Sequence, residues 1–355
     1  MALTNREILH TYLRHDKRFP HIWCPGCGNG IVLSALLRAV NDLGWEKDEV
    51  ALISGIGCAG RAPVYVDFNT VHTAHGRALP FATGIKAVKP RLKVVVLMGD
   101  GDAVGIGGNH FIHACRRNID ITAIVVNNAT YGMTGGQSSP TTPVGGRTAT
   151  AVGGVIETPF DLGRLAEGAG ATFVARSTSY HARQAEEFIK RGFLHKGFSV
   201  VEIITGCHTN YGRRNDAPDP VTVMKSQKES AISLEKAKGM TPDELSGRIV
   251  TGILVDREAP EWTDQYDEVR RRAQAAKAGE EKPLEGRRGS PERAATGSSP
   301  PGLSLPTRWA RAAFTSPRPR PTAQKRGAEP PSQTWWPTRG PSTTPRPSTW
   351  VFSWR

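Results

Sequence analysis

The chain has 355 residues, of which 38% are hydrophobic and 22% charged, and 46 Lys and Arg residues outnumber 33 Asp and Glu residues to give a net charge of +13. This length and apolar content suffice to bury a sizeable core. Residues 1–19 are polar and charged, and no apolar run reaches the length of a membrane span. We therefore expect neither a secretory leader nor a transmembrane protein, and we predict a cytoplasmic location.

The first motif along the chain is a pair of cysteines, Cys24-Pro25-Gly26-Cys27, directly before an amphipathic helix predicted over 30–42. The start of that helix favours both thiolates. A cytoplasmic chain keeps its thiols reduced, so an ordered set of cysteines indicates a metal rather than disulfides. On its own, this pair is compatible with zinc, a redox dithiol or an iron–sulfur cluster.

Two further cysteines follow predicted strands at their carboxyl ends, where open α/β sheets build their sites. Cys58 lies in a glycine loop after a strand expected near 51–54, and Cys207 follows a strand expected near 199–204. Four thiolates suit either zinc or a [4Fe–4S] cluster. The fifth cysteine, Cys115, is predicted to lie within a helix, and we interpret it as a small buried hydrophobic residue.

The centre of the sequence describes a site for a diphosphate and a divalent metal. After a helix expected over about 76–88, the apolar run 94–98 predicts a strand buried on both faces, which ends in Gly99-Asp100-Gly101-Asp102. A helix expected over 107–117 leads to a second buried strand near 121–126, which ends in Asn127-Asn128. Carboxylate and amide oxygens at neighbouring strand ends, beside a helix N-terminus, are what Mg²⁺ bridged to a diphosphate needs.

These elements predict one α/β domain over residues 10–225, with a central parallel sheet flanked by helices. Further helices are expected over 161–168 and 180–192, and a further strand near 172–175. Residues 226–278 are predicted to form a small C-terminal helical appendage, in which a Thr cap precedes a Pro at the first helical position of Met240-Thr241-Pro242-Asp243-Glu244-Leu245.

Residues 279–355 differ in composition from the rest of the chain. They hold 14 of the 26 prolines, and 13 Lys and Arg residues against 5 Asp and Glu residues. They contain no Ile, Asp, Asn, Tyr, His, Met or Cys, so we expect a disordered basic tail rich in Pro, Arg and Ser. No nucleic-acid recognition module accompanies this tail, and nucleic acid is not an expected partner. The same composition results from an out-of-frame reading of GC-rich DNA, so a frameshifted terminus is a second hypothesis.

Together these motifs resemble the beta subunit of the 2-oxoacid:ferredoxin oxidoreductases, over roughly residues 10–270. The segments that carry the resemblance are Trp23-Cys24-Pro25-Gly26-Cys27-Gly28, Gly55-Ile56-Gly57-Cys58, His75-Gly76-Arg77-Ala78, Gly99-Asp100-Gly101-Asp102, Gly107-Gly108-Asn109-His110, Asn127-Asn128, Tyr131-Gly132-Met133-Thr134-Gly135-Gly136-Gln137 and Ser139-Pro140-Thr141. The resemblance implies a thiamine-diphosphate-binding fold that holds thiamine diphosphate, Mg²⁺ and a [4Fe–4S] cluster. It implies oxidative decarboxylation of a 2-oxoacid to acyl-coenzyme A and CO₂, with electrons passed to ferredoxin.

The resemblance also assigns roles to individual residues. Mg²⁺ would be held by the side chains of Asp100 and Asn128 and by the backbone carbonyl of Thr130. The cluster ligands would be Cys24, Cys27, Cys58 and Cys207. The residues around the cofactor would be Ile56, Gly57, Cys58, Ala59, His75, Gly76, Gly101, Asp102, Gly132 and Met133. Candidates to pair with substrate carboxylates or coenzyme A phosphates are Arg61, Lys86, Arg213 and Arg214.

The resemblance implies partners as well. In thiamine enzymes the activating glutamate comes from a second domain of similar size, and the sequence shows no such second domain. An alpha subunit with the pyrimidine-binding domain is therefore expected, and activity is expected only in the complex. Segments 131–137 and 207–215 resemble the 2-oxoglutarate type, although Gly135 stands where family members often carry Lys. Pyruvate and branched-chain 2-oxoacids stay open as substrates.

Two other functional classes compete with this interpretation. A non-redox thiamine-dependent decarboxylase or synthase subunit would share Asp100 and Asn128 but has no use for four placed cysteines. A zinc-stabilised binding protein would use the cysteines but not the diphosphate site. The diphosphate site favours the cluster, because a cofactor that makes carbanions needs an electron acceptor and zinc is not one.

Overall fold

The structure, a computed structural model, describes residues 4–16 and 20–278, and the structural statements below concern these residues. Its strands are β1 (Val50–Ser54), β2 (Asn69–His72), β3 (Lys93–Gly99), β4 (Ile121–Asn127), β5 (Thr130–Tyr131), β6 (Gln137–Ser138), β7 (Phe173–Thr178), β8 (Phe198–Ile204), β9 (Ala231–Ser233) and β10 (Ile249–Asp256). Its α-helices are α1 (Asn5–Tyr12), α2 (Asn29–Asp42), α3 (Ala62–Tyr65), α4 (Ala78–Val88), α5 (Gly108–Arg117), α6 (Leu162–Gly168), α7 (Ala182–Leu194), α8 (Pro220–Ser230), α9 (Leu234–Ala237), α10 (Pro242–Leu245) and α11 (Trp262–Ala278).

Eight of these strands form the main sheet, in the order β2-β1-β3-β4-β8-β7-β10-β9. The six strands from β2 to β7 in this order pair in parallel, whereas β10 pairs antiparallel with β7. Parallel strands end at the same edge, so the loops that follow β1, β2, β3, β4 and β8 all leave the sheet on one side. This is the edge at which open α/β sheets place their ligands.

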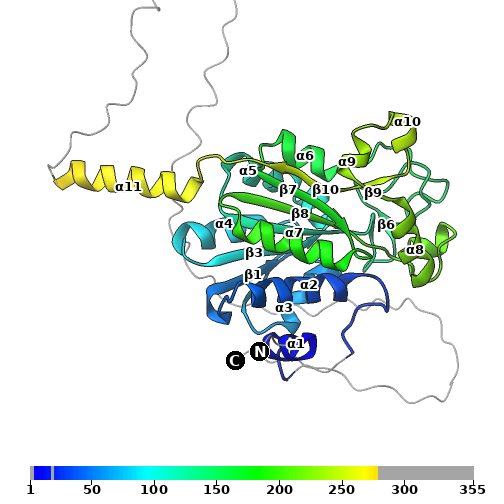
Figure 1. Cartoon of the computed structure of the whole chain (residues 1–355), viewed down its shortest axis with the longest axis horizontal. Helices are drawn as coiled ribbons and strands as arrows, with labels where there is room; N and C mark the ends of the chain where they lie inside the picture. Colours follow the sequence, from blue (N-terminus) through cyan, green and yellow to red (C-terminus); the bar gives the residue numbers. More distant parts are fainter. Residues whose placement is uncertain (1–3, 17–19, 279–355) are drawn as a thin grey trace, which may run out of the picture. The chain divides into compact units, whose positions relative to one another are not determined.

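Helices cover both faces of the sheet, which explains the uninterrupted apolar runs of its central strands. Val95 and Leu97 of β3 pack in the same core cluster as residues of α2 and α7, which lie side by side over one face (Figure 1). Val96 and Met98 point to the other face, where they pack with residues of α4, α5 and α6. Successive side chains of a strand alternate between faces, so a strand covered on both faces is apolar at most of its positions.

Most of the elements expected from the sequence are confirmed. The strands expected near 51–54, 94–98, 121–126, 172–175 and 199–204 correspond to β1, β3, β4, β7 and β8, and the five expected helices correspond to α2, α4, α5, α6 and α7. Helix α10 begins at Pro242, and Thr241 caps it with a reciprocal bond to Glu244. None of the described helices is long and apolar enough to cross a membrane.

The segment 226–278 differs from the expected helical appendage. It contains helices, but it also contributes β9 and β10, and β10 extends the main sheet by pairing with β7. The physical reason is that β7 would otherwise end the sheet with an unpaired row of backbone groups. The expected basic tail over 279–355 lies outside the described residues, and the domain boundary near residue 225 stays a prediction.

Candidate functional site

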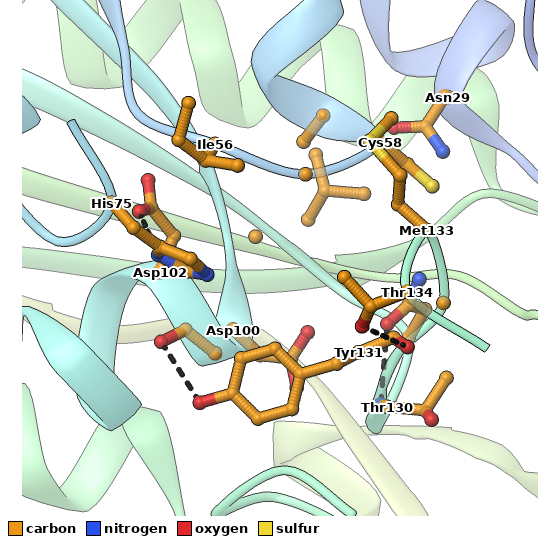
Figure 2. Close-up of a pocket in the computed structure, with 17 residues that line it drawn as sticks. Asn29, Ile56, Cys58, His75, Asp100, Asp102, Thr130, Tyr131, Met133 and Thr134 are labelled. Carbon is orange, nitrogen blue, oxygen red and sulfur yellow. Dashed lines mark hydrogen bonds and ion pairs between the residues drawn. The ribbon is translucent and has the colours of Figure 1, made fainter. Parts of the chain in front are cut away.

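A pocket opens at the carboxyl edge of the sheet, and the ends of three parallel strands build most of it (Figure 2). It is lined by residues 56–59 after β1, by residues 99–102 at the end of β3, and by residues 128 and 130–134 after β4. His75, after β2, and Asn29, at the start of α2, complete its wall. The pocket therefore unites motifs that are up to a hundred residues apart in the sequence.

A buried carboxylate lies at the base of this pocket. Asp100 follows β3 and is only 2% exposed. Its Oδ2 accepts hydrogen bonds from the hydroxyls of Ser139, at 2.6 Å, and Thr141, at 2.7 Å. Burial raises the pKa of the Asp100 carboxyl, although the two hydroxyl bonds partly oppose this rise. A cation beside the carboxylate would favour its ionised form.

The tip of β4 turns back toward Asp100 through a strained residue. Ala129 adopts the left-handed conformation, with φ of +57°, which costs a residue with a Cβ about 1–2 kcal/mol. Two hydrogen bonds hold this turn: Ala129 N–H donates to Asn127 Oδ1 at 3.0 Å, and Thr130 N–H donates to Asn128 Oδ1 at 3.2 Å. Asn128 and Thr130 line the pocket as a result. Backbone strain that a structure retains in this way is characteristic of functional sites.

The chain leaves Asp100 through a π-helical turn, Gly101–Ile106, before α5 begins. The ring of Tyr131 packs against this turn so closely that a Cβ at residue 101 would lie 2.6 Å from its Cζ and 2.8 Å from its Cδ1. Only glycine fits there. The sequence predicts a helix from Gly107, and the wider turn before it is a feature that helical periodicity does not reveal.

His75 and Asp102 form a pair on the side of the pocket opposite Cys58 and Met133 (Figure 2). His75 Nδ1 lies 2.6 Å from Asp102 Oδ1, and the same oxygen accepts a 2.6 Å hydrogen bond from Gly76 N–H. Asp102 is 3% exposed, and its Oδ2 has no hydrogen-bond partner among the described residues. Its carboxylate therefore orients the His75 ring, which is itself partly exposed to the pocket.

Four cysteines gather beside the pocket. Cys58 lies in its wall, and a Cβ built on Gly132, also in the wall, would lie 3.2 Å from Cys207 Sγ and 3.9 Å from Cys58 Sγ. Burial and then the neighbouring thiols of Cys207, Cys27 and Cys24 raise the pKa of Cys58 to about 11. The thiols of Cys24, Cys27 and Cys207 thus all lie near the Cys58 thiol.

The Cys24–Cys27 turn is tied to the same region. Cys27 N–H donates to the carbonyl of Cys24, the Asn29 amide donates to Cys27 Sγ at 3.4 Å, and the Trp23 indole N–H donates to the carbonyl of Cys58 at 2.7 Å. In the described part of the chain, no three His, Cys, Asp or Glu side chains converge on one point as ligands of a single metal ion do.

The structure brings together most of the residues singled out in the sequence. Those that line the pocket are Ile56, Gly57, Cys58, Ala59, His75, Asp100, Gly101, Asp102, Asn128, Thr130, Gly132 and Met133. Gly76 contributes from behind, through its bond to Asp102. Arg61, at the end of a 3₁₀ turn, is not among the lining residues.

One interpretation of a single residue needs revision. Lys86 is buried, forms an ion pair with Asp120 at 2.5 Å and donates to the carbonyl of Leu92, so the expectation that it meets a substrate is wrong. Cys115, by contrast, is fully buried in the apolar layer under α5, as expected. Burial raises the pKa of its thiol to about 12.

Some residues of the site had no role in the sequence interpretation. They are Asn29, Tyr131 and Thr134 in the pocket wall, and Ser139 and Thr141 on Asp100. All but Asn29 stand in segments that carry the family resemblance, so the signal was present. Their roles depend on hydrogen bonds and ring contacts that spacing alone does not predict.

Comparison with known proteins places the chain in a family. Residues 55–203 match the family "Thiamine pyrophosphate enzyme, C-terminal TPP binding domain". The 2-oxoglutarate synthase subunit KorB of Methanocaldococcus jannaschii is 50% identical over 258 residues, which cover 73% of this chain and 95% of the relative. A 2-oxoacid:ferredoxin oxidoreductase subunit beta from a Sulfolobus species is 38% identical, covering 66% of this chain and 82% of the relative.

A solved structure agrees with these relatives. It is the 2-oxoglutarate:ferredoxin oxidoreductase of Magnetococcus marinus with 2-oxoglutarate, coenzyme A and succinyl-CoA bound. The TM-score is 0.66 at 31% identity, covering 75% of this chain and 90% of the chain matched. The thiamine-diphosphate-binding fold expected from the sequence is thereby confirmed. The chain belongs to the family of 2-oxoacid:ferredoxin oxidoreductase beta subunits.

Proposed function

We propose that this chain carries the cofactor site of a 2-oxoglutarate:ferredoxin oxidoreductase and acts together with an alpha subunit. The observation that carries the proposal is that four thiols lie beside a thiamine-diphosphate-type pocket, at the same edge of one sheet. Cys58 belongs to both groups, because its loop lines the pocket while its thiol joins the other three. A redox enzyme needs this neighbourhood, whereas a non-redox thiamine enzyme does not.

The residues at the base of the pocket fit Mg²⁺. Asp100 supplies a carboxylate, Asn128 an amide oxygen with a second lone pair free, and Thr130 a carbonyl at the end of the strained turn. All are hard oxygen donors, which Mg²⁺ prefers. The raised pKa of Asp100 marks a carboxyl group whose ionised form a bound cation would stabilise. We propose these three residues as the Mg²⁺ ligands.

The four thiols fit a [4Fe–4S] cluster in donor chemistry. Thiolates are the ligands of such clusters, and each of the four binds a different iron. Ligands arranged around a cluster therefore need not converge on one point, whereas the ligands of a single zinc ion do. We propose Cys24, Cys27, Cys58 and Cys207 as the cluster ligands.

When bound, thiamine diphosphate supplies a carbon nucleophile and electron sink for the 2-oxoacid, and the cluster accepts electrons one at a time. The chain's own residues orient and shield these groups. Asp102 fixes His75, whose free ring nitrogen is proposed to face the diphosphate. Ile56 and Met133, both partly exposed apolar side chains in the pocket wall, would keep water from the reacting atoms.

The choice of 2-oxoglutarate rests on the names of the relatives, and the alpha subunit on the expected second half-site. Coenzyme A and ferredoxin complete the proposed set of partners. A cytoplasmic location is part of the proposal, because a cluster held by reduced thiols suits a reducing compartment. Arg61, Arg213 and Arg214 stay predictions as contacts of substrate or coenzyme A.

The proposal is tested by co-expressing the full chain with its alpha subunit and assaying viologen reduction under anaerobic conditions. We expect 2-oxoglutarate to reduce viologen only when coenzyme A is present, and pyruvate and branched-chain 2-oxoacids to act far more slowly. Preference for another 2-oxoacid would refute the assignment of 2-oxoglutarate as the substrate. A colourless complex that contains zinc but no iron would refute the redox function.

A further inference from the structure

A buried ion pair lies behind the pocket without lining it. Glu202 of β8 is 2% exposed, and its Oε2 accepts a 2.6 Å hydrogen bond from Arg176 Nε of β7. Arg176 also donates to Asp161 at 2.5 Å, closer to the surface. A buried charge pair contributes little to stability on balance. Its presence in the sheet therefore calls for another explanation.

The other oxygen of Glu202 reaches the tip of β4. Asn127 Nδ2 donates to Glu202 Oε1 at 2.8 Å. An ionised carboxylate can only accept hydrogen bonds, so the amide NH₂ of Asn127 must face Glu202. Its Oδ1 consequently faces the opposite way, where it accepts from Ala129 N–H at 3.0 Å and lies 3.0 Å from the hydroxyl of Thr141.

This orientation matters for the turn that follows β4. The bond from Ala129 N–H to Asn127 Oδ1 holds Ala129 in its left-handed conformation. Asn128 and Thr130, two of the proposed Mg²⁺ ligands, are the residues directly before and after Ala129. Thr141 connects the same amide to the other side of the site, since its hydroxyl donates to Asp100 Oδ2 at 2.7 Å. Glu202 is thus linked through Asn127 to the turn that carries Asn128 and Thr130. The link to Asp100 passes through Thr141 as well, whose hydroxyl lies within hydrogen-bond distance of both Asn127 Oδ1 and Asp100 Oδ2.

We propose that Glu202 is a positioning residue for the metal site, because it fixes the orientation of the Asn127 amide and thereby the turn that presents Asn128 and Thr130. This inference rests on the Mg²⁺–thiamine diphosphate function proposed above. Arg176 has the complementary role of holding the Glu202 carboxylate by its Oε2, which leaves Oε1 to accept from Asn127. Asn127, the first residue of the Asn-Asn pair, is then an orienting residue and not a ligand.

The substitution Glu202→Gln tests the inference because it creates a conflict of donors. Arg176 still needs an acceptor and takes the Gln carbonyl, so the Gln NH₂ faces Asn127. Asn127 must then turn its side-chain carbonyl toward the new Gln side chain. This places the Asn127 NH₂ against Ala129 N–H, so that two hydrogen-bond donors face each other without an acceptor. We expect the Mg²⁺ affinity to fall by roughly 10–100-fold, as for other residues that orient metal ligands.

The double variant Glu202→Gln/Asn127→Asp removes the conflict while conserving charge. An Asp carboxylate accepts from the Gln NH₂ with one oxygen and from Ala129 N–H with the other. We expect it to restore the Mg²⁺ affinity to within about threefold of wild type, a difference of about 0.7 kcal/mol. Asn127→Asp alone places two carboxylates face to face, so it is expected not to raise the affinity, which controls for the added charge.

The measurement is calorimetric titration of thiamine diphosphate into the complex of full chain and alpha subunit at increasing Mg²⁺, with thermal unfolding recorded in parallel. Asp161→Asn changes the outer partner of Arg176 and keeps a side chain that can cap α6, so it is the matched control and should leave Mg²⁺ affinity unchanged. Wild-type affinity in Glu202→Gln, or a double variant as weak as Glu202→Gln, would overturn the inference. If wild type itself binds thiamine diphosphate without needing Mg²⁺, the proposed function fails instead.

Discussion

Two serine substitutions should separate the cluster ligands from the remaining cysteine. Cys58→Ser replaces a thiol that lies in the pocket wall beside three others. Cys115→Ser replaces a thiol that is fully buried in the apolar layer beneath α5. The two substitutions are chemically identical, so a difference between them reports the surroundings of each sulfur. We expect loss of iron in Cys58→Ser alone.

The two substitutions should differ in the size of their effects on iron content and on stability. A [4Fe–4S] cluster holds about four irons per chain, and removing one of its four ligands should reduce this content to well under half. At Cys115 the new hydroxyl finds an apolar environment, which costs about 1–3 kcal/mol of unfolding free energy. The carbonyl one helical turn earlier can accept from a serine, so the lower half of that range is expected. Each kcal/mol lowers Tm by roughly 2–4 °C at this chain length.

The assay is iron and sulfide analysis of the anaerobically purified complex, with Tm recorded on the same samples. The expected result is low iron in Cys58→Ser, and wild-type iron with a lower Tm in Cys115→Ser. Equal loss of iron in both variants would mean that the four ligands are wrongly chosen. A wild-type iron content in Cys58→Ser would refute the proposal that Cys58 is a cluster ligand as well as a residue of the pocket wall.

Three further predictions concern the pocket and the fold. Asp100→Asn should weaken Mg²⁺–thiamine diphosphate binding at least roughly tenfold in calorimetry, because the variant loses a buried charge. Its circular dichroism spectrum should stay normal, since no packing is lost. Unchanged affinity would count against Asp100 as a ligand. Gly101→Ala should displace the Tyr131 ring and lower the free energy of unfolding in urea by about 1–3 kcal/mol. Gly108 has open space around it, so Gly108→Ala should change this free energy little. Similar losses in both variants would contradict the close contact between residue 101 and the Tyr131 ring. Burial lowers the pKa of His195 in the folded chain. As pH falls below about 6.5, the unfolded chain therefore binds a proton at this residue before the folded chain does. The free energy of unfolding should then decrease until the pH reaches the lower pKa of the folded chain. His195→Gln should therefore lose less stability than wild type between pH 7.5 and 5.5 in urea unfolding, and an equal loss would show that this histidine does not contribute.

The parallel core of the sheet could be predicted from the sequence because it is buried on both faces. Such strands are mainly apolar runs, which β1, β3 and β4 show most clearly, whereas β7 and β8 each contain a charged residue, Arg176 and Glu202. Their order in the sheet could not be predicted, because it depends on which strands pair and not on the composition of any one of them.

The strands at the two sides of the sheet were missed for a physical reason. β2 is an edge strand, Asn69–His72, whose side chains are all at least partly exposed. β10 is only partly buried and contains Gly252, so it shows neither a continuous apolar run nor clean alternation. Both strands pair with a neighbour through their backbones, and backbone pairing leaves little trace in sequence.

The candidate site was predictable to the extent that its residues stand in short motifs at strand ends. Glycines, Asp100 and the Asn-Asn pair identify the loops, and the topology brings these loops to one edge. What spacing could not show is the support behind them. Glu202 stands in an apolar strand 75 residues from Asn127, and only the pairing of β4 with β8 makes them neighbours.

Visible absorbance can show whether one site holds both the thiamine chemistry and its electron acceptor. The anaerobic complex of full chain and alpha subunit is mixed with 2-oxoglutarate, with and without coenzyme A, while the cluster absorbance is followed in time. We expect a brown complex whose absorbance bleaches on substrate addition, fully only with coenzyme A, and no bleaching in the chain alone. A brown complex that 2-oxoglutarate leaves unbleached, or an isolated chain that bleaches at the rate of the complex, would contradict this expectation.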